Sequence, residues 1–161
     1  MLHSDALQEQ WKTYSAAAVS AGRSAEPSDW AVARNIFVGD TTSEAQRLAR
    51  ANSSGQCIQY ILDLTNATAP NGIAMWKRDQ EQADADCNLD HFMNDVVIAG
   101  DPDHVAGESL KLREEIGPFG SLVLTAHDWD DRERWIRSLE LFTQEVWPAF
   151  NRAIGAVGSY D

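Results

Sequence analysis

The chain has 161 residues, of which 13 are basic and 25 acidic, and its formal net charge is −12. A surface this acidic repels nucleic-acid phosphates and anionic lipid headgroups, so the composition argues against a nucleic-acid-binding face and against electrostatic anchoring to a membrane. The length suits one domain, which could bury roughly 70% of the surface of the unfolded chain.

No stretch of the sequence approaches the ~20 consecutive apolar residues of a membrane span. The first six residues, Met1–Ala6, lack the basic and apolar regions of a signal peptide. We therefore expect a cytoplasmic protein. In that compartment Cys57 and Cys87, which form no CxxC motif, should be reduced thiols.

The first third of the chain predicts a helix, a buried strand and a second helix. Residues 5–21 place apolar side chains on one helical face, and Gly22 follows as a stop signal. Residues 31–38 form an apolar run that suits a buried strand. Thr41 and Glu44 then have the spacing of a capping box, which predicts the start of the next helix.

The segment 56–94 is the least regular part of the sequence, with short helices expected at 57–64, 73–82 and 89–93. Its acidic stretch Asp84–Asp95 resembles a calcium loop only superficially, because the sixth position is Leu89 instead of glycine. His91 lacks the spaced partners that zinc requires. We expect a solvated acidic surface here and no metal site.

The remainder predicts two more strands, each followed by a helix. Residues 96–99 form one strand, after which Asp101 and Pro102 provide an N-cap and a first helical residue. Residues 122–126 form another strand, whose lack of a polar face predicts burial on both sides. The last helix should turn an apolar stripe inward, consisting of Trp135, Leu139, Phe142 and Val146. This alternation predicts an α/β fold with a parallel sheet.

Three blocks of sequence together resemble the bacterial-luciferase-like flavin-dependent monooxygenases, in that family's order and with comparable spacing. Two departures are Trp147, where methionine is common, and Asp101, which replaces the usual serine or threonine. The blocks are Trp30–Thr41 with Glu44 and Ala45, then Val97–Val105, then Arg137–Pro148.

The resemblance implies a particular incomplete fold. A full (β/α)8 barrel needs about 250 residues, so residues 1–161 would be a single domain equivalent to the C-terminal part of a luciferase-like barrel. About three parallel strands with covering helices are expected, with 56–94 as a variable excursion over the barrel mouth. The family's first five strands, which supply most flavin-phosphate contacts, lie outside this sequence.

The resemblance also implies a function. The chain would be a component of a monooxygenase that uses reduced FMN, supplied by a separate flavin reductase, to oxygenate a small organic substrate with molecular oxygen. A second copy or a second polypeptide would complete the barrel, and FMN binding by this chain alone should be weak or absent. The alternative is a non-catalytic remnant that acts as a binding or interaction module.

Candidate site residues lie where the parallel strands end, because such ends share one rim of a sheet. We expect His127 and Asp128 to be catalytic, Trp129 to form a wall of the substrate pocket and Asn35 to line its floor. No residue is assigned to the cofactor. The 56–94 excursion should act as the lid.

Simpler roles remain open for several of these residues. His127 could hydrogen-bond a loop carbonyl, and Asp130 or Asp131 could cap the final helix. Arg34, which points away from Asn35 on the same strand, is expected to pair with a carboxylate between the sheet and the helices.

Overall fold

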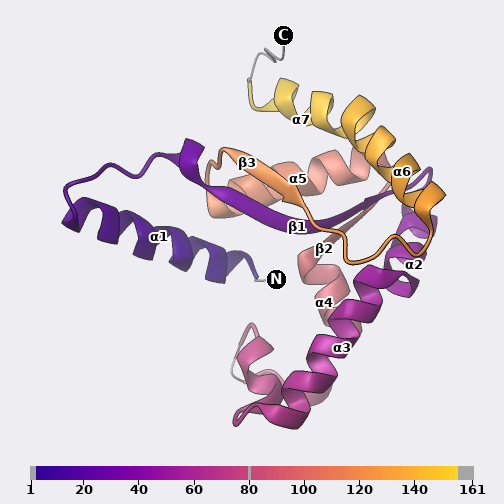
Figure 1. Cartoon of the computed structure of the whole chain (residues 1–161), viewed down its shortest axis with the longest axis horizontal. Helices are drawn as coiled ribbons and strands as arrows, with labels where there is room; N and C mark the ends of the chain where they lie inside the picture. The colour runs from indigo at the N-terminus through magenta and orange to yellow at the C-terminus, as the bar shows by residue number, and fades with distance from the viewer. Residues whose placement is uncertain (1–2, 80, 156–161) are drawn as a thin grey trace.

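A computed structural model describes residues 3–79 and 81–155, which form one three-stranded parallel sheet with helices packed around it (Figure 1). The strands are β1 (Ala31–Val38), β2 (Val97–Gly100) and β3 (Ser121–Leu124). The helices are α1 (Ser4–Ser20), α2 (Thr42–Ala51), α3 (Ser53–Thr68), α4 (Leu89–Val96), α5 (Pro102–Ile116), α6 (Arg132–Leu141) and α7 (Trp147–Ala153). A π-helical turn, Phe142–Val146, joins the last two, and short 3-10 turns cover Pro27–Asp29, Gly72–Trp76 and Asp84–Asp86.

The first strand lies in the middle of the sheet, in the order β2-β1-β3. The first half of β1 pairs with β3, with Ala31 opposite Ser121, and its second half pairs with β2, with Asn35 opposite Val97. The chain therefore crosses from β1 to β2 on one side of it, and then from β2 past β1 to β3 on the other side. Because such crossovers are right-handed, the connecting helices lie on opposite faces of the sheet. The predicted parallel strands and covering helices are confirmed.

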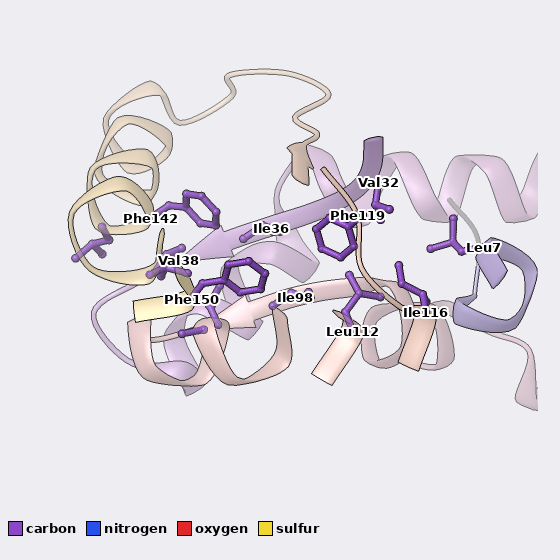
Figure 2. Close-up of a cluster of buried hydrophobic side chains, with 14 residues drawn as sticks. Leu7, Val32, Ile36, Val38, Ile98, Leu112, Ile116, Phe119, Phe142 and Phe150 are labelled. Atoms are coloured by element: carbon purple, nitrogen blue, oxygen red, sulfur yellow. The ribbon is translucent and has the colours of Figure 1, made fainter. Parts of the chain in front are cut away.

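One face of the sheet packs on α5 and the C-terminal helices (Figure 2). Alternate residues of β1 point toward this layer, so Val32, Ile36 and Val38 are each at most 3% exposed. Their partners include Leu112 of α5 and Phe150 of α7. The other face packs on α2, α3 and α4 and on Trp135 of α6, whose ring meets Phe37 edge-on with ring centroids 5.0 Å apart.

Among the described residues, no helix covers one part of this second face. Where β1 runs beside β3, Ala31, Ala33 and Ser121 are exposed and Val123 is 44% exposed. The prediction that the 122–126 strand is buried on both sides is therefore wrong. Its apolar outward residues suit a strand with a second covering layer, and the described residues provide a layer on one side only.

The predicted helix starts are confirmed by side-chain caps. Thr41 accepts the backbone N–H of Glu44 at 3.4 Å, and Asp101 accepts that of His104 at 2.9 Å. The inward stripe of the last helix is correct except for Leu139, which is 38% exposed, whereas Leu141 is buried. A π-helical turn, Phe142–Val146, follows α6, and its Phe142 and Val146 are buried as predicted.

The segment 56–94 departs most from expectation. The helix predicted at 57–64 is the longer α3, and the helix predicted at 73–82 is only the turn Gly72–Trp76. A local alternative explains the second error, since the Asp79 carboxylate accepts the N–H of Glu81 at 3.0 Å and closes a turn there.

This segment does not form the expected lid over the strand ends. Only the start of α3 lies near them, and the helix then leads away from the sheet (Figure 1). At its far end the carbonyl oxygen of Trp76 lies 3.1 Å from Nε2 of His3, beside α1. Cys57 and Cys87 are both free, as predicted. None of the described helices is long and apolar enough to cross a membrane.

Candidate functional site

Three polar side chains meet on the second face of the sheet, at the end of β3. The Thr125 N–H donates to the carbonyl of Arg34 at 2.9 Å, which keeps the chain alongside β1 after β3 has ended. The Thr125 hydroxyl then donates to Oδ1 of Asn35. The amide Nδ2 of Asn35 lies 3.2 Å from Nε2 of His127. We call Asn35, Thr125 and His127 the polar cluster.

The hydrogen bonds of the polar cluster assign a proton to one histidine nitrogen. Because Oδ1 of Asn35 accepts the threonine hydroxyl, Nδ2 is the end of the amide that faces His127 and it donates to Nε2. A neutral imidazole that accepts at Nε2 carries its proton on Nδ1. Asn35 is only 1% exposed, whereas the His127 ring is exposed. The histidine can therefore meet a ligand, while Asn35 lies beneath it.

Asp128 and Trp129 continue the loop beyond the polar cluster. The carboxylate of Asp128 accepts the Trp129 N–H at 2.7 Å, and its backbone carbonyl accepts the Ser53 hydroxyl at 2.9 Å. These bonds connect the loop to the start of α3. The Trp129 side chain is 47% exposed, so it offers a large apolar surface close to His127 in the sequence.

The next two aspartates are structural. Asp131 accepts the N–H of Arg134 at 3.2 Å, so the prediction that one of the pair caps the final helix is confirmed. Asp130 accepts the N–H of Ser53 and the indole N–H of Trp135, each at 3.0 Å. Burial alone would raise the pKa of Asp130, but these hydrogen bonds outweigh it and hold that pKa below its ordinary value.

Arg34 lies on the opposite face of β1 and is 2% exposed. Its Nη1 donates to the carbonyl of Ala33 at 3.2 Å. Burial lowers the pKa of Arg34, and the nearby charge of Glu115 opposes this shift. The expected ion pair is not formed, since no described carboxylate lies within ion-pair distance of Arg34, and Glu115 acts on the guanidinium only through its charge.

The strand ends form two separate places instead of one rim. At the first, the Gly39 N–H donates to the Gly100 carbonyl at 2.9 Å, and the Thr42 hydroxyl donates to Asp101 at 2.6 Å. At the second, β3 ends beside the middle of β1, so His127 lies at the level of Asn35. A cavity of about 330 Å³ lies at the first place, lined by residues that include Phe37, Gly39, Asp40, Glu44, Arg134 and Arg137.

Sequence reasoning brought Asn35 and His127 into one candidate site but missed Thr125. Thr125 is the hydroxyl residue near the end of the apolar run 122–126, and a polar side chain at that place is the feature of the sequence that could have indicated a site residue. Its partner could not be read, because the pairing of β3 with β1 instead of β2 is a property of the sheet order.

Comparison with known proteins places this geometry in a family. No family model matches the chain. It is 35% identical over 154 residues to 3,6-diketocamphane 1,6-monooxygenase of Pseudomonas putida, an alignment that covers 89% of this chain and 38% of that enzyme. It is 29% identical over 153 residues to 2,5-diketocamphane 1,2-monooxygenase 1 of the same species, covering 89% of this chain and 40% of that enzyme.

Solved structures agree. The oxygenating constituent of 3,6-diketocamphane monooxygenase from Pseudomonas putida, a type II Baeyer–Villiger monooxygenase in complex with FMN, matches with a TM-score of 0.76 and 34% identity. The match covers 92% of this chain and 41% of that one. The chain thus spans about two fifths of the relatives that it matches. Its homologues are luciferase-like flavin-dependent monooxygenases, which include these type II Baeyer–Villiger enzymes, and it matches them as a chain of partial length.

Proposed function

We propose that this chain is the C-terminal part of a reduced-FMN-dependent monooxygenase that oxygenates a small organic substrate with molecular oxygen. The rest of the barrel would come from a second polypeptide or from more of the same one. The observation that carries the proposal is the uncovered sheet face beside the polar cluster, in a chain that is 34% identical to an FMN-bound relative. Residues 1–161 act in this proposal as one domain.

The uncovered face suits one part of a flavin. Ala31, Ala33 and Val123 give it a flat, mostly apolar surface, and Thr125 and His127 add hydrogen-bonding groups at its end. Ligand sites are clefts lined mostly by apolar side chains, with a few polar groups that fix the orientation of the ligand, and the other walls of such a cleft would come from the rest of the barrel. We assign the phosphate contacts to the rest of the barrel, so FMN should bind weakly or not at all to this chain alone.

In this proposal the polar cluster orients His127 at the reaction site. Bound reduced FMN supplies the activation of oxygen. Asn35 acts as a positioning residue, because at 1% exposure it cannot touch a ligand and must act through Nε2 of His127. His127 then directs its Nδ1–H at the substrate, and Trp129 covers the site and excludes water.

Asp128 has a supporting role in the same proposal, since its carboxylate holds the N–H of Trp129 and fixes the turn. The partners are a separate flavin reductase, which delivers reduced FMN, and a polypeptide or second copy that covers the open sheet face. Cytoplasmic residence fits both, because reduced flavin must pass between soluble proteins before oxygen consumes it.

Reconstitution tests the function. The part of the Pseudomonas putida 3,6-diketocamphane 1,6-monooxygenase that this chain does not match is mixed with this chain, and oxygenation of the diketone is measured with reduced FMN. We expect activity from the mixture and from neither part alone. His127→Ala should reduce turnover while leaving stability within about 0.5 kcal/mol, as for other surface substitutions.

His104→Ala is the matched control, because His104 lies on α5 away from the polar cluster. An inactive mixture in which the two parts nevertheless form a complex would favour the non-catalytic binding module. Loss of folding in His127→Ala would show that His127 is structural.

A further inference from the structure

Two histidines and an aspartate converge at the junction of α1 and α4, away from the polar cluster. His3 stands directly before α1, whereas His91 and Asp95 lie one turn apart on the same face of α4. Nδ1 of His3 lies 3.3 Å from Oδ2 of Asp95, and Nε2 of His91 lies 3.6 Å from the same oxygen. All three atoms are within 4.8 Å of one another.

These three atoms are buried and have no hydrogen-bond partner among the described residues. An unsatisfied buried polar atom costs about 1–3 kcal/mol, so native proteins rarely leave one alone. Three such atoms within 4.8 Å of one another indicate a group held between them.

The tautomer of His3 suits it to be a ligand. The carbonyl oxygen of Trp76 lies 3.1 Å from Nε2 of His3 and can only accept, so Nε2 carries the proton. Nδ1 then has its lone pair directed at Asp95. Histidines that bind metals commonly donate their other N–H to a backbone carbonyl in this way, which fixes the orientation of the ring.

The spacing of the atoms agrees with tetrahedral coordination. Zinc binds histidine nitrogen and carboxylate oxygen at about 2.0–2.2 Å, which places two tetrahedral ligands roughly 3.3–3.5 Å apart. The two measured separations to Asp95, 3.3 and 3.6 Å, lie close to that range. A fourth ligand could be water, because a cavity of about 100 Å³ is lined by His3 and Asp95.

We propose that His3, His91 and Asp95 form a binding site for a divalent transition-metal ion, and that zinc is the ion this ligand set fits best. The site joins the start of α1 to α4, two segments that are 88 positions apart from His3 to His91. Its role is to fix α1 against the rest of the domain. The expectation of no metal site followed from the sequence around His91, in which His3 could not be seen as a partner.

A competing cation lies nearby. Nη1 of Arg78 is 3.7 Å from Oδ2 of Asp95, and its Nε is 3.8 Å from Asp5. The Arg78 side chain is 48% exposed, so solvent screens this pair and it contributes little. When the ion binds, Arg78 can keep Asp5 as its partner. Without any ion, Asp95 would instead pair with Arg78.

Titration of the chelator-treated protein separates these two possibilities. Zinc is titrated in competition with a chromophoric chelator, and cobalt is used to read the geometry from its visible absorption bands. We expect one ion per chain, tetrahedral cobalt bands and a rise in Tm with zinc, because the ion binds only the folded state. His3→Gln, His91→Gln and Asp95→Asn should each weaken binding at least about tenfold.

His104→Gln is the control, since it removes a histidine that lies outside the site and should leave binding unchanged. Circular dichroism verifies that each variant is folded, and Asp95→Asn, which keeps the shape of the side chain, serves if a histidine variant unfolds. The proposal is overturned if the wild-type protein binds no stoichiometric zinc or cobalt. It is also overturned if all three variants bind like the wild type, or if binding is lost only when Cys57 or Cys87 is replaced by serine.

Discussion

The amide nitrogen of Asn35 lies 3.2 Å from Nε2 of His127, a contact between the middle of β1 and the loop after β3 that spans 92 positions. Asn35 is almost completely buried and His127 is exposed. A buried amide that is hydrogen-bonded at both its oxygen and its nitrogen, beneath an exposed imidazole, fixes both the orientation of the ring and the nitrogen that carries its proton. This contact is the centre of the proposed site.

The tautomer of His127 can be measured directly. We predict that neutral His127 carries its proton on Nδ1, because Nε2 accepts from Asn35. Two-bond 1H–15N correlation spectra at about pH 9, where imidazoles are neutral, report the protonated nitrogen. Thr125→Val should release the amide and produce a mixture of tautomers, whereas Thr143→Val, on the π-helical turn, should not. A wild-type ring protonated on Nε2 would contradict the assignment.

The end of β1 depends on a serine from α6. The hydroxyl oxygen of Ser138 accepts the buried N–H of Val38 at 2.8 Å. Ser138→Ala leaves that N–H without a partner, so we expect a loss of about 1–3 kcal/mol in the free energy of unfolding. Urea unfolding measures it.

Ser109→Ala is the matched control for Ser138→Ala. Ser109 is equally buried on a helix, but its hydroxyl donates to the Val105 carbonyl of its own helix at 2.7 Å. Its removal leaves no backbone N–H unpaired, and we expect a smaller loss. Equal losses of stability in the two variants would show that the hydrogen bond from Val38 to Ser138 contributes no more than the bond of Ser109 within its own helix.

Asp101 should make stability depend on pH. The Thr42 hydroxyl and the His104 N–H donate to its carboxylate and hold the pKa of Asp101 below its ordinary value. A lowered folded-state pKa gives stability that is present above the unfolded pKa of about 3.9. That stability is lost as the pH falls through the folded value.

The comparison of Asp101→Ala with the wild type at several pH values tests this. Loss of the N-cap should cost about 0.5–2 kcal/mol at pH 7, and the difference should shrink below about pH 4 as the wild-type carboxylate becomes protonated. Asp101→Asn keeps a capping oxygen, so its free energy of unfolding at pH 7 should lie between that of the wild type and that of Asp101→Ala. A difference that does not change with pH would refute the role of the charge.

The uncovered face of β1 and β3 should make the isolated chain associate. Exposed apolar sheet surface is an interaction surface or an aggregation hazard. We expect light scattering at micromolar concentration to show species larger than a monomer, and Val123→Asp to reduce them. Leu139→Asp, at an exposed apolar position on α6, should have little effect. A compact wild-type monomer would count against the open face as an interface.

Local signals in the sequence predicted most elements of the fold. Thr41 and Asp101 cap helices as their spacing indicates, because capping depends on neighbours within one turn. The turn at Asp79 was missed because the apolar content of 73–82 outweighed a single side chain that closes a local turn.

The arrangement of the elements could not be predicted in the same way. Nothing local to β3 states that it pairs with the first half of β1, and that pairing alone brings Thr125 and His127 to Asn35. Likewise His91 and Asp95 are visible as neighbours on one helix, but His3 reaches them only through the packing of the whole domain.

The most direct test of the proposed function is a flavin titration of the two parts of the barrel. Quenching of FMN fluorescence is measured with this chain alone, with the unmatched part of the 3,6-diketocamphane enzyme alone, and with both. We predict weak or no binding by this chain and tight, stoichiometric binding by the mixture. Tight binding by this chain alone, or a mixture that binds no better than the added part, would contradict the proposal that the chain completes a flavin-binding barrel.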